Sequence, residues 1–263
     1  MRGSLAKEKA MTIEVGVKTD IGLLRKNNED DFIINVENGI FAVADGMGGH
    51  LGGEVASFLA CNLIKEALIK ELVGNSPRDI LLRIQRILNW TNREIRKVGK
   101  KDPKVKGMGS TITLLLLRRL KYYIAQIGDS RAYLFRGGTL TRLTKDHSQI
   151  QELIDKGMIT EKEAKDDERA HIITRCLGVE EKVKPDFYYG DLKEGDTFLL
   201  CTDGLWGLLE EREIEKILKR KKDLQTISEI LVEKAKKKGG TDNITALVVR
   251  VNGLGGGKIN SGK

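Results

Sequence analysis

FAVADGMGGHLGGEVAS, the stretch from Phe41 to Ser57, joins a predicted strand to a predicted helix through one aspartate and a run of glycines. The small apolar residues of Ile40–Ala44 predict a buried strand that ends at Asp45. Five glycines follow within eight residues, and a nucleotide-binding turn, a metal site or a plain structural turn can each begin in this way. The helix is predicted because apolar residues then recur at helical spacing, at Ala56, Leu59, Ala60, Leu63 and Ala67.

Strand and helix patterns on both sides of this stretch predict the fold class. Strands are predicted at Thr12–Lys18, Phe32–Val36, Ile40–Ala44, Thr111–Leu117, Tyr122–Ile127, Ala132–Phe135, Leu140–Leu143, Lys184–Tyr189, Thr197–Cys201 and Ile244–Val251. Further helices are predicted after the Ser76-Pro77 start signal, near Glu211–Arg220 and at Leu224–Lys238. The strands come in hairpin-linked groups and the helices in pairs, which differs from βαβ alternation. We therefore expect an α+β fold of two packed antiparallel sheets, each covered by a pair of helices.

The length of the chain and its lack of proline-rich or glycine-rich linkers predict a single domain. The chain has 263 residues and only three prolines, and no long Ser/Gly/Pro linker interrupts its interior. Residues 1–10 are charged and polar and are expected to be a leader or an appended segment, so the domain is placed at 11–252. Residues 253–263 are glycine-rich and predict a flexible tail. The polar, helical segment 146–178 predicts an inserted flap, with a capping box at Thr160 and Glu163.

Charge and cysteine content limit the possible partners and compartments. The net charge of +8 tolerates anionic partners, but no nucleic-acid partner is expected because no aromatic platform or recognition motif accompanies it. The basic runs Leu218–Lys222 and Glu233–Gly240 are more often solvated helix faces than binding patches. Three irregularly spaced cysteines, of which Cys61 and Cys201 are expected to be buried thiols, indicate a reducing compartment such as the cytoplasm. No segment approaches the roughly 20 apolar residues of a membrane span.

Four aspartates share one sequence context, because each lies where an apolar strand leaves or joins a turn. If the strands are neighbours, their ends bring several carboxylates together, which is unfavourable unless a cation neutralises them. Hard oxygen ligands without His or Cys suit Mg²⁺ or Mn²⁺. One Asp-Gly pair at a strand end is more often simple turn chemistry, but four such sites in one chain favour a metal centre. The four are Asp45, Asp129, Asp203 and Asp242.

The segment RKNNEDDF adds a possible phosphate ligand and more acidic residues. Arg25 is a candidate oxyanion partner, and Glu29, Asp30 and Asp31 extend the acidic set. An arginine near acidic residues is by itself more often part of a surface ion pair. Competing motifs fail: a dinucleotide fingerprint from Gly46 would require glycine where Leu51 stands, and neither a Walker A motif nor a cysteine-phosphatase pattern occurs.

Taken in order, the motifs resemble those of a known family. They are LLRKNNEDDF, VADGMGGHLGGEVAS, GMGST, IGDSRAYL, DHS, ITRCLG, LLCTDGLWG and GGTDNITALVV. Together they resemble the successive motifs of the metal-dependent protein phosphatases, the PPM or PP2C family, and are most similar to its bacterial serine/threonine phosphatases. The resemblance extends from about Thr12 to Val251, and the combination of DGMGGH with TDGLW and TDNIT is highly specific.

The resemblance implies a four-layer α-β-β-α sandwich with a binuclear Mn²⁺ or Mg²⁺ centre. Asp45 would bridge the two ions, Gly46 would offer its carbonyl oxygen, and Asp203 and Asp242 would be ligands. Asp30, with Glu29, would hold metal-bound water. A third ion would bind through Asp129 together with Asp203, and Arg25 would bind the substrate phosphate.

The implied reaction is hydrolysis of phosphoserine and phosphothreonine in proteins. Two divalent ions lower the pKa of a water that attacks phosphorus in line, so no phosphoenzyme forms. Eukaryotic relatives carry a histidine directly after the Asp-Gly pair as the general acid, but Met47 stands there in this chain. His50 or a water would then supply the proton, and His147 and His171 are expected to be structural or to contact the flap. We expect a monomer that acts on phosphorylated proteins, including a bacterial serine/threonine kinase and its substrates.

Overall fold

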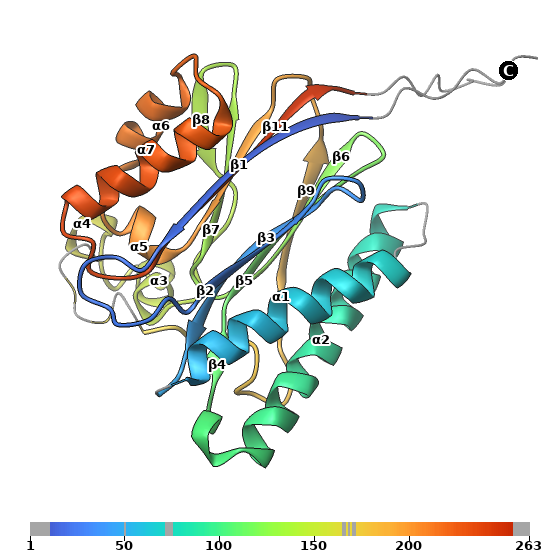
Figure 1. Ribbon diagram of the computed structural model, residues 1–263, viewed down its shortest axis with the longest axis vertical. Helices are drawn as coiled ribbons and strands as arrows, with labels where there is room; N and C mark the ends of the chain where they lie inside the picture. The colour runs from blue at the N-terminus through green and yellow to red at the C-terminus, as the bar shows by residue number, and fades with distance from the viewer. Residues whose placement is uncertain are drawn as a thin grey trace, which may run out of the picture.

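The computed structural model of the chain describes residues 11–49, 51–71, 76–164, 167, 169 and 172–254. Two antiparallel sheets pack face to face between two layers of helices (Figure 1), which confirms the predicted α-β-β-α sandwich. The predicted leader lies outside the described residues. So does the predicted tail from residue 255 onward, whereas Gly253 still belongs to the last strand.

The first sheet joins the two ends of the described chain. Its strand order is β1-β11-β10-β7-β8. These strands are β1 Thr12–Asp20, β11 Ile244–Gly253, β10 Thr197–Cys201, β7 Arg131–Arg136 and β8 Thr139–Arg142. Successive side chains of a strand point to opposite faces. Phe198 and Leu200 of β10 therefore enter the core between the sheets, whereas Leu199 and Cys201 face the helices.

The second sheet contains the stretch with which the sequence analysis begins. Its order is β2-β3-β5-β6-β9, and the short strand β4 pairs with the end of β3. The strands are β2 Asp30–Asn35, β3 Ile40–Met47, β4 Gly109–Ser110, β5 Ile112–Arg118, β6 Lys121–Ile127 and β9 Asp186–Asp191. The prediction that the third strand ends at Ala44 is wrong, because Gly46 pairs with Ser110 and Met47 pairs with Gly109. Asp45 therefore lies inside a strand and not beyond its end.

Each sheet carries its own helix layer. Helices α1 (Gly52–Glu71) and α2 (Pro77–Lys101) cover the second sheet, and α5 (Asp203–Trp206), α6 (Glu211–Leu218) and α7 (Leu224–Lys237) cover the first (Figure 1). A 3₁₀ helix spans Pro103–Val105. The predicted start of α2 is confirmed, because the Ser76 side chain accepts a hydrogen bond from the Asp79 N–H. Helix α6 ends at Leu218 and not at Arg220 as predicted, so the basic run that follows is a loop.

The segment 146–178 contains two short helices, α3 (Gln149–Asp155) and α4 (Glu161–Ala164). The predicted capping box is confirmed, since the Thr160 N–H donates to Glu163 Oε2 and the Glu163 N–H donates to Thr160 Oγ1. Two isolated bridges, Ser148 with Ile173 and Ser110 with Leu177, fix the ends of the segment to the rest of the domain. Its role as a flap stays a prediction.

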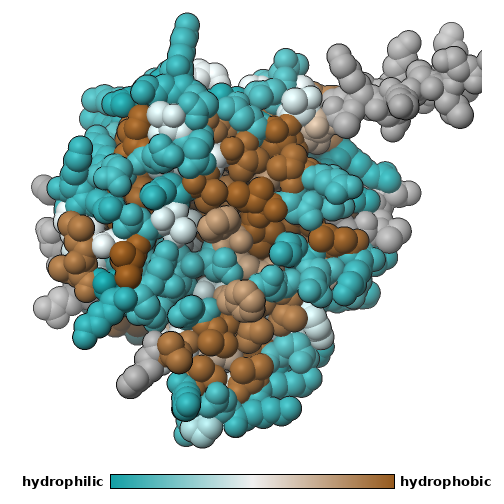
Figure 2. Space-filling model, in the orientation of Figure 1, coloured by the Kyte–Doolittle hydropathy of each residue, from teal (hydrophilic) through white to brown (hydrophobic). Residues whose placement is uncertain are grey.

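Hydrophobic and hydrophilic side chains separate on the molecular surface. In Figure 2, hydrophobic side chains gather along the middle of the face, where Figure 1 places the edge of the sandwich between the helix layers. Partly buried residues of β1 and β2, including Val15, Val17 and Phe32, pack there against the core between the sheets. None of the helices in the described ranges combines the length and apolarity that crossing a bilayer requires.

Candidate metal centre

The predicted carboxylates meet at one end of the sandwich. Asp45 lies in β3 directly opposite Asp30 of β2, while Asp203 follows β10 and Asp242 precedes β11. Burial raises the pKa of Asp45 well above its usual value, and the nearby charges of Asp203, Asp30, Asp129 and Asp242 raise it further. Residues from both sheets thus place their charges around Asp45, which is the arrangement that the sequence predicts.

Asp30 is anchored through one oxygen and leaves the other available. Its Oδ2 accepts hydrogen bonds from Thr202 Oγ1 at 2.8 Å and from Thr245 Oγ1 at 2.6 Å. Its Oδ1 is buried and accepts no hydrogen bond from any described residue. Burial raises the pKa of Asp30 to about 7, although the two hydroxyl hydrogen bonds lower it. A buried carboxylate oxygen without a partner is costly, so this oxygen suits a bound water or ion.

Asp31 does not belong to the cluster, although the sequence analysis includes it in the acidic set. It is the next residue along β2, so its side chain points to the opposite face of the sheet. There it interacts with Cys61 and Lys65 of α1. Burial raises the pKa of Asp31, while the N–H of Phe32 donates to its Oδ1 at 2.7 Å.

The backbone around Asp45 is fixed by neighbouring segments. The Asp45 N–H donates to Thr111 Oγ1 and the Thr111 N–H donates back to the Asp45 carbonyl oxygen, both at 2.8 Å. The Gly46 N–H donates to the carbonyl oxygen of Glu29 at 3.0 Å. A Cβ atom on Gly46 would lie 2.0 Å from the carbonyl oxygen of Gly53 and 2.7 Å from that of Glu29. Only glycine therefore fits at this position, where β2, β3 and the start of α1 converge.

Asp129 is linked to the segment 146–178. The Trp206 indole N–H donates to the Asp129 carbonyl oxygen at 3.0 Å, and the Arg131 guanidinium stacks 3.4 Å from the Trp206 ring centroid. Arg131 Nη2 in turn lies 2.7 Å from Asp146 Oδ2. Asp129 Oδ1 is buried and has no hydrogen-bond partner among the described residues. Burial, followed by the charges of Asp203 and Asp146, raises the pKa of Asp129 well above its usual value.

Arg25 stands at the rim of the cluster. Its Nη2 lies 2.6 Å from Asp242 Oδ2, and its side chain is 54% exposed. The hydrogen bond to Asp242 raises the pKa of Arg25, as do the charges of Asp203 and Asp45. This guanidinium can therefore contact both the cluster and an incoming anion. Glu29 lies closer to α1, because a Cβ on Gly53 would come within 2.1 Å of its Oε2.

Asn243 is a site residue that the sequence analysis missed. Its Oδ1 accepts from the Glu29 N–H at 2.8 Å, and its Nδ2 donates to the carbonyl oxygens of Ile21 at 3.0 Å and Asn27 at 2.9 Å. One buried amide thus holds both ends of the loop that carries Arg25. The residue stands in the motif TDNIT, but no sequence signal identifies its partners, which lie more than two hundred positions earlier.

The histidines are not part of the carboxylate cluster as far as the structure describes them. His147 is buried, its Nδ1 accepts from the Gly128 N–H at 3.1 Å, and its Nε2 lies 3.2 Å from Asp186 Oδ2. Burial lowers the pKa of His147. These contacts hold the ring in place, and the role of His147, structural or in contact with the flap, stays a prediction. His50 and His171 lie outside the described residues, so the role of His50 as general acid stays a prediction.

The donor set fits a hard divalent cation. It includes the carboxylates of Asp30, Asp45 and Asp129, whose pKa values burial raises, and a glycine position that a Cβ would fill; Asp30 and Asp129 each have one buried oxygen without a hydrogen-bond partner within the described ranges. No three His, Cys, Asp or Glu side chains among the described residues lie close enough to enclose an ion by themselves. Each ion would therefore complete its coordination with water, as Mg²⁺ commonly does when only one or two carboxylates bind it.

Comparison with known proteins identifies the family of the chain. The protein-family model described as Protein phosphatase 2C matches residues 25–240, which is most of the chain. The chain belongs to the protein phosphatase 2C family. It is 39% identical over 245 residues to the serine/threonine phosphatase stp of Listeria welshimeri, covering 89% of this chain and 94% of that protein.

Solved structures of the same family superimpose on nearly the whole chain. The serine/threonine phosphatase Stp1 of Staphylococcus aureus has a TM-score of 0.86 and 28% identity, covering 96% of this chain and 100% of that one. The catalytic domain of the serine/threonine protein phosphatase PstP, in complex with two manganese ions, has a TM-score of 0.81 and 34% identity, with 92% and 99% coverage. The second relative holds metal on the same fold.

Replacing Asn243 with alanine is expected to lower kcat/KM for a phosphopeptide by about 10- to 100-fold, the usual effect of losing a residue that orients a metal or substrate ligand. The loop that carries Arg25 would lose three hydrogen bonds, so KM should rise more than kcat falls. Gln225→Ala is the matched control, because Gln225 also holds the N-terminal segment through two hydrogen bonds, both to Val17. Equal kinetic losses in both variants would contradict a specific role for Asn243.

Proposed function

We propose that this chain, a serine/threonine protein phosphatase by its family and relatives, hydrolyses phosphoserine and phosphothreonine in proteins at a binuclear Mn²⁺ or Mg²⁺ centre. The observation that carries the proposal is the convergence of carboxylates from both sheets around Asp45, with Arg25 at the rim. Asp45, Gly46, Asp203 and Asp242 would hold the two ions. Asp129 and Asp203 would hold a third.

Residues of the chain bind the substrate phosphate and position water. When bound, the ions supply an acidified water and neutralise charge on the phosphoryl oxygens. Arg25 binds two phosphoryl oxygens through its guanidinium and so orients phosphorus for in-line attack. Asp30 Oδ1 accepts a hydrogen bond from a water, while its Oδ2 stays fixed by two threonine hydroxyls. Glu29 assists in holding water on the α1 side.

The overall reaction forms one P–O bond to water and breaks the bond between phosphorus and the serine or threonine oxygen. The leaving oxygen takes up a proton, and inorganic phosphate is released. Met47 cannot donate that proton, so we propose that His50 or a water does. The protein itself never carries the phosphate.

We further propose that the phosphatase acts as a monomer in the bacterial cytoplasm and reverses a serine/threonine kinase. Three free cysteines, all buried, support a reducing compartment. The phosphoproteins made by such a kinase would be the substrates, and the kinase itself would be one of them.

The proposal is tested with p-nitrophenyl phosphate and a phosphothreonine peptide. We expect turnover of both with Mn²⁺, loss of turnover in EDTA and recovery when Mn²⁺ is restored in excess. A peptide labelled with ³²P should leave no label on the protein after quenching. Full activity after complete chelation would contradict the proposal. Calorimetric binding of Mn²⁺ without turnover would also contradict it and would indicate a phosphoprotein-binding protein.

A further inference from the structure

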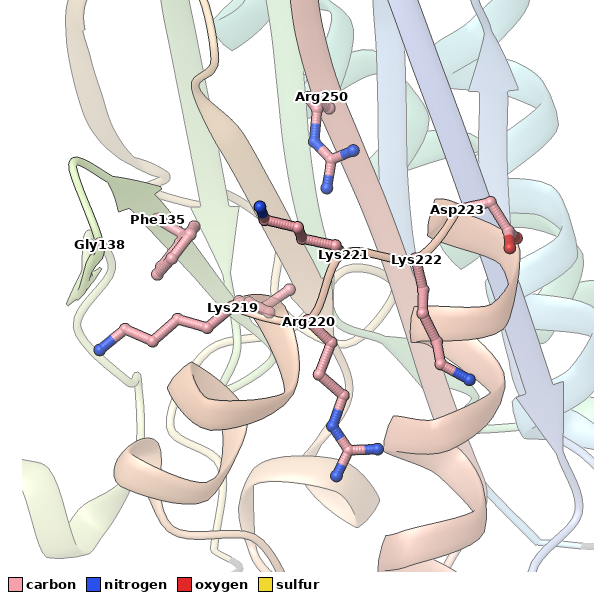
Figure 3. Close-up of a pocket in the computed structure, with 9 residues that line it drawn as sticks. Phe135, Gly138, Lys219, Arg220, Lys221, Lys222, Asp223 and Arg250 are labelled. Atoms are coloured by element: carbon pink, nitrogen blue, oxygen red, sulfur yellow. The ribbon is translucent and has the colours of Figure 1, made fainter.

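A basic pocket lies beside the loop between α6 and α7 (Figure 3). None of the residues that line it belongs to the carboxylate cluster. Its volume is about 550 Å³. The loop residues from Lys219 to Asp223 form its wall, and Phe135 and Arg250 of the first sheet, with Gly138 of the turn between β7 and β8, form its floor. We refer to it as the α6–α7 pocket. Helix α6 ends before this loop, so the pocket is the place where the helix layer stops covering the sheet.

The floor of the α6–α7 pocket is a row across the first sheet. Phe135 of β7 pairs with Thr197 of β10, and Thr197 pairs with Arg250 of β11. Arg250 Nε donates to Thr197 Oγ1 at 3.3 Å, and its Nη1 lies 3.2 Å from Glu14 Oε2. These contacts hold the guanidinium in place, so the floor carries an aromatic ring on β7 and, two strands away on β11, a fixed guanidinium that pairs with Glu14.

The loop that forms the wall contains four consecutive basic residues, Lys219 to Lys222, which have few acidic partners. Lys219 pairs with Glu215 at 2.5 Å. Arg220, Lys221 and Lys222 form no ion pair with a described residue, and Asp223 is occupied as the N-terminal cap of α7. In Figure 3, Lys221 extends into the space between Phe135 and Arg250, whereas Arg220 and Lys222 extend away from it. The ammonium of Lys221 and the guanidinium of Arg250 therefore approach the same space.

The pocket is separate from the metal centre. Strand β11 begins at Ile244, next to the cluster, and reaches Arg250 six residues later, a distance of about 20 Å at about 3.3 Å per residue. A single phosphorylated side chain cannot occupy both places. A flexible linker of about fifteen residues has a root-mean-square length that matches this span, so one extended polypeptide can reach both.

We propose that the α6–α7 pocket binds an anionic segment of the protein substrate, distant in sequence from the phosphoresidue that is hydrolysed. The inference rests on the proposed function, because the partner must be a phosphoprotein. A polypeptide fits better than a nucleic acid or a lipid surface, because Glu14, Glu215 and Asp223 lie around the cations. A continuous array of phosphates would meet these carboxylates, whereas separate acidic or phosphorylated side chains can avoid them.

Two peptides test the proposal. Each carries one phosphothreonine, a Gly/Ser linker of about fifteen residues and a tail, which is four glutamates in one and four glutamines in the other. For the wild type we expect the glutamate tail to lower KM about tenfold at low salt, with kcat unchanged and the advantage reduced at high ionic strength. A third peptide with a non-hydrolysable phosphoserine mimic in its tail distinguishes phosphate from carboxylate as the preferred anion.

Neighbouring charge reversals are the matched variants. Lys221→Glu should abolish the tenfold advantage, whereas Lys222→Glu makes the same change in net charge on a side chain that extends away and should retain most of it. Turnover of p-nitrophenyl phosphate should be unchanged in both, which separates a failure of this inference from a failure of the proposed function. Equal KM values for the two tails in the wild type would overturn the inference. Equal losses in both variants would also overturn it, as would Lys221-dependent binding of DNA or anionic vesicles without any tail effect.

Discussion

Asp45→Asn is expected to lower kcat for p-nitrophenyl phosphate with Mn²⁺ by about 1,000-fold, comparable to removing a principal electrostatic group from an active site. Asp45 lies at the centre of the cluster, where four other carboxylates act on its charge. Asparagine keeps the shape and the backbone hydrogen bonds to Thr111 but removes the charge that would neutralise the ions. Calorimetry should show that Mn²⁺ affinity falls together with activity.

The same variant is expected to be more stable than the wild type without metal. The pKa of Asp45 is raised from its usual 3.8, so the folded state binds more protons than the unfolded state above that pH, and the free energy of unfolding falls as pH rises. Asparagine does not ionise, so the Asp45→Asn variant lacks this fall in the free energy of unfolding. Its stability gain in urea denaturation with EDTA should therefore be larger at pH 8 than at pH 5.

Asp31→Asn is the matched control, because Asp31 stands beside Asp30 on β2 but faces α1. It should keep activity within about threefold, since it lies on the opposite face from the cluster. An Asp45→Asn enzyme that retained a tenth or more of wild-type kcat would contradict the central role of Asp45. Comparable losses in the two variants would contradict the division of the acidic residues between the two faces of β2.

Gly46→Ala is expected to destabilise the protein by about 3 kcal/mol, the upper range for inserting a methyl group into a packed site, and to remove most activity. The new Cβ would lie 2.0 Å from the Gly53 carbonyl oxygen, and all three atoms within 2.7 Å belong to the backbone, so no side-chain rotation can relieve the contact. The strand must therefore move away from α1, which displaces Asp45. Urea denaturation and p-nitrophenyl phosphate turnover measure the two effects.

Gly49→Ala provides the control for this position in the same glycine-rich stretch. A Cβ there would meet no atom within 4 Å, so stability should change by less than about 1 kcal/mol and activity should be retained. If both variants behaved alike, the glycines of this stretch would matter for chain flexibility rather than for the close contact at Gly46.

Local patterns predicted the carboxylate cluster because Asp45, Asp203 and Asp242 each adjoin a strongly apolar strand. Once two antiparallel sheets are expected, strand ends on neighbouring strands must meet at one end of the sandwich. The same reasoning failed for Asp31, because only the pairing of Asp30 with Asp45 determines which face each side chain takes. A shift of one residue in that pairing would exchange the two.

Contacts between distant segments were not predictable in this way. Asn243 holds a loop that is separated from it in sequence by almost the whole domain. Trp206 belongs to a helix of four residues, which is too short to show a periodic pattern in the sequence. For the basic run Leu218–Lys222, composition favours a solvated helix face, whereas the structure places most of it in a loop. Its geometry depends on where α6 stops relative to the sheet, and that end point is set by packing rather than by composition.

The pairing of β1 with β11 makes the order of synthesis matter. β1 lies at the edge of its sheet, and among the described strands it pairs with β11 alone, with Val17 opposite Leu247. At the usual rate of translation, the first strand waits about 10 to 50 s for its partner to be made. Until then the loop that carries Arg25 lacks Asn243, and Asp30 lacks Thr202 and then Thr245. A nascent chain that ends before Asp242 therefore contains Asp45 but lacks the contacts of Asn243 and Thr245 that hold the Arg25 loop and Asp30 in place.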